Sequence, residues 1–76
     1  AVDQVALLEH QLHLLGRSDY LPEPLARVRA QRKPSTHSTC SVIGRSLGQL
    51  TRQQGDEALL QELAAHPSDM LRCWAA

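Results

Sequence analysis

The chain has no phenylalanine, one tryptophan and one tyrosine among its 76 residues. Its core must therefore be built almost entirely from aliphatic side chains. A chain of this length buries only about 60% of the surface that its unfolded form exposes. The hydrophobic content of 42% still favours a folded chain over a disordered one. We therefore expect one small domain, residues 1–76, with a thin core.

Long apolar runs are also missing, and none approaches the ~18 residues of a membrane-spanning helix. The first residues show no basic flank followed by a long apolar stretch, so no signal peptide is visible. Two cysteines, Cys40 and Cys73, are too few for the disulfide framework of a small secreted protein. We expect Cys40 to be a small buried residue and Cys73 to pack in the core beside Trp74. These absences favour a cytoplasmic protein that makes no membrane contact.

Acidic residues are absent from residues 24–55, although the chain as a whole carries eight basic and eight acidic residues. Six arginines and lysines lie in that middle stretch, and the acids lie on either side of it. The net charge of zero therefore hides a basic middle between two acidic ends.

Alternating β-type patterns are absent as well, whereas apolar residues recur at helical spacing. Val5, Leu8, Leu12 and Leu15 form one such stripe, and Gly16 follows it as a plausible cap. The pattern predicts an all-α chain of about five short antiparallel helices. We expect them near residues 2–15, 22–34, 39–53, 57–66 and 69–76.

Local signals support several of the expected boundaries. Pro22 or Pro24 can open the second helix, where a missing N–H costs little. Asp56 is expected to cap the fourth helix through its side chain. Gly44 and Gly48, four residues apart within the third helix, leave room for a neighbouring helix to approach closely.

The second half of the chain resembles a HEAT-type helical repeat. The run Ser46-Leu47-Gly48-Gln49-Leu50 is similar to the family's inner helix, and Leu71-Arg72 stands where the family has a Val-Arg pair. Cys40 stands where the earlier repeat would carry its Arg, and His66 and Ser68 replace the Asp residues of the usual turn. The resemblance implies stacked helices in residues 39–76, with two helices of less certain type in residues 1–34. A generic small helical bundle is the alternative fold.

Candidate chemistry is sparse. His10 and His13 lie one helical turn apart and could share a metal ion, but no further ligands are spaced nearby. His37 and Cys40 could form a nucleophile pair, yet the acid-free middle offers no orienting carboxylate. We therefore predict no catalytic residue, no metal site, no cofactor and no enzymatic activity.

The best binding candidates are a basic patch and an apolar stripe. The basic patch is Arg27, Arg29, Arg32 and Lys33, four cations within seven residues. The stripe of Val5, Leu8, Leu12 and Leu15 is either core or a seam for another chain. The sequence predicts a non-catalytic scaffold that binds a protein partner through this patch. The alternatives are nucleic-acid binding through the same cations and self-association through the stripe.

Overall fold

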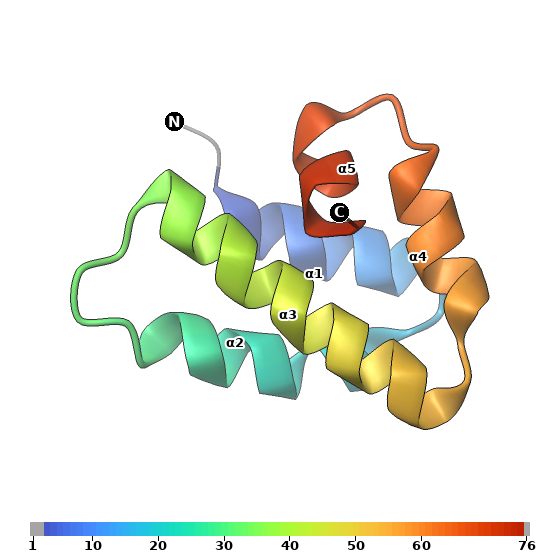
Figure 1. Ribbon diagram of the computed structural model, residues 1–76, viewed down its shortest axis with the longest axis horizontal. Coiled ribbons are helices and arrows are strands. Elements are labelled where there is room, and N and C mark those ends of the chain that lie inside the picture. The colour runs from blue at the N-terminus through green and yellow to red at the C-terminus, as the bar shows by residue number, and fades with distance from the viewer. Residues whose placement is uncertain (1–2, 76) are drawn as a thin grey trace.

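The longest helix, α3 (Thr36–Gln54), crosses the middle of the structure and contacts α2, α4 and α5. The computed structural model describes residues 3–75 and is drawn in Figure 1. Within that range the chain forms five α-helices and one short 3-10 turn, with no strand, so the predicted all-α class is confirmed as a small helical bundle. The other elements are α1 (Gln4–Leu14), η1 (Ser18–Tyr20), α2 (Pro22–Arg29), α4 (Glu57–Ala64) and α5 (Asp69–Ala75).

Helix α1 has clear signals at both ends. The Asp3 side chain accepts a hydrogen bond from the Ala6 N–H at 3.1 Å. At the other end Gly16 adopts φ 68°, and the Arg17 N–H reaches back to the Leu12 carbonyl at 2.8 Å. A left-handed residue after the last turn favours glycine, so the predicted role of Gly16 is confirmed. Val2, where the sequence placed the helix start, lies outside the described residues.

Helix α2 is shorter than predicted. It begins at Pro22 but ends at Arg29, well before Pro34. The Gln31 side chain donates to the Val28 carbonyl at 3.3 Å and to the Thr39 hydroxyl at 3.2 Å. These bonds turn the chain out of the helix toward α3, because they satisfy a terminal carbonyl that a longer helix would have used.

Helix α3 begins three residues before the predicted start. Ser35 caps it by accepting from the Ser38 N–H at 3.0 Å, while the Ser38 hydroxyl accepts from the Ser35 N–H at 2.9 Å. This reciprocal pair satisfies two free donors and contributes about 1 kcal/mol. The helix ends at Gly55, which adopts φ 66°.

Helices α4 and α5 form a tight pair joined by the turn 65–68, as Figure 1 shows. Arg72 closes this turn: its guanidinium donates to the carbonyls of His66 and Pro67, each at 2.8 Å, and pairs with Asp69. The Ser68 N–H donates to the His66 imidazole at 3.0 Å. Polar contacts within the turn therefore fix the angle between the two helices.

The core draws side chains from both ends of the chain. Gln4, only 5% exposed, donates to the Thr36 carbonyl at 2.9 Å and accepts from the Trp74 indole at 3.2 Å. Buried polar groups need hydrogen-bond partners, and both the nitrogen and the oxygen of the Gln4 amide find one within the fold. The buried hydrophobic residues are Leu8, Leu12, Tyr20, Cys40, Ile43, Leu47, Leu59, Leu63, Leu71 and Trp74.

The two glycines inside α3 differ in what lies against them. A Cβ on Gly44 would stand 2.9 Å from the backbone carbonyl oxygen of Trp74, so α5 approaches the bare α3 backbone at this point. A Cβ on Gly48 would meet only the tip of the Arg52 side chain, at 4.0 Å. The predicted close approach of a neighbouring helix is thus confirmed at Gly44 and is absent at Gly48.

Replacing each glycine with alanine tests this difference within one helix. Both substitutions gain about 1 kcal/mol of helix propensity. We expect Gly48→Ala to raise the free energy of unfolding, since nothing rigid opposes the new methyl group. Gly44→Ala should lower it by about 1–2 kcal/mol, because overpacking against a backbone atom outweighs the gain in propensity. Urea denaturation measures both, and equal shifts of the two midpoints would contradict the close approach.

Candidate functional site

The basic patch lies at the end of α2 and in the connection to α3, and its four side chains are all exposed. Arg27 is already engaged, because its guanidinium donates to Glu23 at 3.0 and 3.1 Å one turn away. In the described part of the chain, Arg29, Arg32 and Lys33 have no carboxylate partner. The structure therefore leaves three of the four predicted cations free to meet an external anion.

The backbone that carries these cations is held in place. Gln31 lies between them in sequence and bonds to both Val28 and Thr39, which ties the connection to α2 and α3. In Figure 1 this connection forms the long bend between the two helices. Cations on an anchored backbone need less ordering when they bind, because part of the conformational entropy has already been lost on folding.

The predicted apolar stripe of α1 is core packing. Leu8 and Leu12 are 1% and 0% exposed, and Val5 and Leu15 are half-buried. A partner could not use the two central leucines without opening the core, so the interpretation as a seam is wrong. The large apolar side chain of α1 that is exposed is Leu14, at 63%, which lies outside the predicted set.

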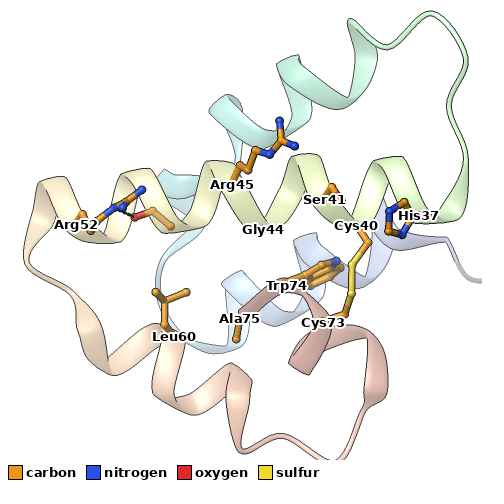
Figure 2. Close-up of a pocket in the computed structure, with 11 residues that line it drawn as sticks. His37, Cys40, Ser41, Gly44, Arg45, Arg52, Leu60, Cys73, Trp74 and Ala75 are labelled. Atoms are coloured by element: carbon orange, nitrogen blue, oxygen red, sulfur yellow. Dashed lines mark hydrogen bonds between the residues drawn. A yellow bond between two sulfur atoms is a disulfide. The ribbon is translucent and has the colours of Figure 1, made fainter.

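A groove of about 550 Å³ runs along α3 beside the middle of α4 and the end of α5 (Figure 2). One face of α3 forms much of it: His37, Ser41, Gly44, Arg45, Gly48 and Arg52. Leu60, Trp74 and Ala75 line it from the other two helices. In Figure 2 the Arg52 side chain lies back along α3. Its guanidinium donates to the Gly48 carbonyl at 3.1 Å.

A disulfide between Cys40 and Cys73 stands at one end of this groove and joins α3 to α5 (Figure 2). The prediction for Cys73 was wrong, since it is an exposed residue bonded to Cys40 rather than part of the core. Cys40 is buried, as predicted, but it carries no free thiol. The His37–Cys40 pair, considered above as a nucleophile candidate and not adopted, therefore has no thiolate in this structure.

A polar cluster at the start of α4 was not predicted. Asp56 precedes the helix, but its carboxylate accepts from the Tyr20 hydroxyl at 3.1 Å instead of capping the helix, and it lies 3.6 Å from the Arg17 Nε. The Arg17 guanidinium covers the Tyr20 ring at 4.2 Å. Burial, with the hydrogen bond to Asp56, raises the pKa of Tyr20, so its hydroxyl stays a donor to higher pH than that of an exposed tyrosine. The cluster fastens η1 to the α3–α4 connection.

The two histidines of α1 are both exposed. Among residues 3–75 no group of three His, Cys, Asp or Glu side chains is placed to hold a metal ion. No helix in the same range is long and apolar enough to cross a bilayer.

Comparison with known proteins found no match among family models, curated proteins or solved structures. The functional argument therefore rests on the surfaces described above.

Sequence reasoning placed the basic patch but missed the groove. Arg45 and Arg52 belong to the acid-free middle, and Gly44 and Gly48 were recognised only as points of close approach. The signal that joins them is their spacing, since residues at 41, 44, 45, 48 and 52 share one face of a helix. Cys73 and Leu60, on the other helices, give no such signal.

Proposed function

We propose that this chain is a non-catalytic helical domain that binds an acidic surface on a protein partner. The observation that carries the proposal is the set of three exposed cations, Arg29, Arg32 and Lys33, which have no carboxylate partner among the described residues. They lie on an anchored connection inside an acid-free stretch of sequence. Such a surface attracts acidic groups and contributes to the rate and specificity of association.

A non-catalytic role is supported by the state of the strongest nucleophile candidate. The sulfur of Cys40 is bonded to Cys73, so a thiolate mechanism has no starting group in the folded chain. The other titratable clusters serve structure: Arg17, Tyr20 and Asp56 bind one another, and Arg72 binds the α4–α5 turn.

A protein partner is favoured over a nucleic acid by the aromatic residues. The chain has one tyrosine and one tryptophan, and Tyr20 and Trp74 are 2% and 1% exposed. Neither can offer a ring on which a base could stack, a common contribution to single-strand binding. Phosphate contacts alone remain for the basic patch, and they would give salt-dependent binding without sequence preference.

The test uses a labelled oligoglutamate peptide and a labelled duplex DNA, titrated with the protein at low and physiological salt. We expect the peptide to bind at low salt. Added salt should weaken this binding, since interactions between exposed charges are screened. Replacing Arg29, Arg32 and Lys33 together with glutamine should weaken binding about tenfold, because each exposed ion pair contributes about 0.2–1 kcal/mol.

The matched control is Arg27→Gln compared with Arg29→Gln. The two variants lose one charge each, two residues apart on α2, but only Arg27 is already bound to Glu23. We expect Arg29→Gln to weaken binding more. Equal effects, no peptide binding at low salt, or tighter binding of the duplex than of the peptide would contradict the proposal.

The HEAT-like arrangement remains our proposal for how the helices stack. It is supported by the tight α4–α5 pair and by the disulfide, which links the two helices that the resemblance treats as equivalent. Cys40 stands where the repeat would have an Arg, so the covalent bond holds the neighbours together in place of a polar contact. Arg72 binds the turn of its own repeat instead.

The disulfide also bears on the compartment. Such bonds persist in oxidising compartments and are rare where glutathione and thioredoxin keep thiols reduced. We therefore favour an oxidising compartment over the cytoplasmic location that the sequence predicted. Alkylation of free thiols before and after reduction, on protein taken from its native source, measures the oxidised fraction.

A further inference from the structure

The groove on α3 is a second cationic surface, separate from the basic patch. Arg45 and Arg52 are exposed residues that line it, and His37 lines it at the end near the disulfide. Among the described residues that line it there is no Asp or Glu, because α3 has no acidic residue, α4 contributes only Leu60 and α5 contributes only its last residues. Its volume falls within the ~300–1,000 Å³ that protein clefts devote to a ligand.

The two arginines are set at a fixed distance by the helix that carries them. They are seven residues apart, and a rise of 1.5 Å per residue separates their backbones by about 10.5 Å along α3. Between them lies Gly48, which has no side chain of its own and whose carbonyl accepts a hydrogen bond from the Arg52 guanidinium. Leu60 and Ala75, both half-buried, provide apolar surface on the opposite wall.

We propose that this groove binds an extended acidic segment of a partner protein, with two carboxylates placed to meet Arg45 and Arg52. A segment in the extended polyproline II conformation advances about 3.1 Å per residue with about three residues per turn, so carboxylates three residues apart share one face and are about 9 Å apart. The two residues between the carboxylates point to the other sides of such a segment, and from there they can contact Leu60 and Ala75. This site does not depend on the basic patch, which lies beyond the N-terminal end of α3.

The test compares two labelled peptides of the same composition and charge. One carries two glutamates three residues apart, and the other carries them side by side. We expect the spaced peptide to bind about two- to fivefold more tightly, since only it can pair with both arginines at once and so gains one further exposed ion pair. Fluorescence anisotropy measures the affinities, and emission of Trp74, the single tryptophan and part of the lining, gives a label-free signal.

Two variants and one control identify the site on the protein at which the peptide binds. Arg45→Gln combined with Arg52→Gln should remove the preference for the spaced peptide. Gly48→Leu should weaken its binding about tenfold with both charges kept, because a side chain would fill the groove between them. The triple glutamine variant of Arg29, Arg32 and Lys33 should keep the preference, which separates this site from the basic patch.

Three results would overturn the proposal: equal affinity for the two peptides, an unchanged preference in the double arginine variant, or loss of the preference in the triple variant. Displacement of the spaced peptide by duplex DNA of equal charge at lower concentration would also overturn it, in favour of a phosphate backbone as the occupant.

Discussion

Reduction of the Cys40–Cys73 disulfide lowers the free energy of unfolding by about 2–4 kcal/mol, the range typical for a cross-link that closes a loop of this size. The bonded residues are separated by 33 positions, so opening the bond releases a long loop in the unfolded chain. A domain of this length is typically stabilised by only about 0.05–0.15 kcal/mol per residue, so this loss is a large fraction of the total.

Urea denaturation of the oxidised and the dithiothreitol-treated protein measures the effect. A change of 1 kcal/mol shifts the melting temperature of a small domain by roughly 4–8 °C, so thermal melts will also detect it. The control is Cys40→Ala combined with Cys73→Ser, which should match the reduced protein and should not respond to reductant. A reduced midpoint equal to the oxidised one would show that the bond does not restrain the chain.

Trp74→Ala should cost about 3–5 kcal/mol, the usual range for removing a buried aromatic side chain. Trp74 is 1% exposed and packs in the core that α5 shares with the other helices. The substitution also leaves the buried Gln4 carbonyl oxygen without its donor, which adds to the cost. We expect the variant to be largely unfolded at room temperature.

Trp74→Phe separates the two contributions, because it keeps an aromatic ring but removes the indole N–H. Its cost should be smaller than that of the alanine variant and should largely disappear when Gln4 is replaced by Leu, which removes the unpaired acceptor. Leu14→Ala, at a position that is 63% exposed, is the control and should change stability little. A Trp74→Ala variant as stable as that control would contradict the packing described for α5.

Helix identity was predictable from the sequence because its signals are local. The spacing of apolar residues predicted α1 and the inward face of α3. Gly16 and Gly55 marked helix ends, because each adopts a backbone conformation that favours glycine. The errors at helix ends have the same physical origin. Gln31 ends α2 early through a bond to Thr39, and Ser35 starts α3 early through a bond to Ser38, and neither partnership can be read from propensity alone.

The candidate site was only partly predictable, because contacts between distant residues decided it. Nothing in the spacing of Cys40 and Cys73 distinguishes two buried thiols from a bond between α3 and α5. Asp56 has the sequence position of a helix cap, but Tyr20, 36 residues away, takes its carboxylate. The ion pair of Arg27 with Glu23 is an exception, because the two residues are four positions apart on one helix and the sequence alone favours their contact.

The hydrogen bond between Gln4 and Trp74 joins residues 70 positions apart, almost the whole length of the chain. Local fraying usually begins at chain ends, which open with little free energy. Here α1 and α5 hold each other, so neither end can open alone without exposing the indole of one or the amide of the other. The exchange of the Trp74 indole proton with solvent deuterium therefore reports every opening that separates α1 from α5, whichever end of the chain moves.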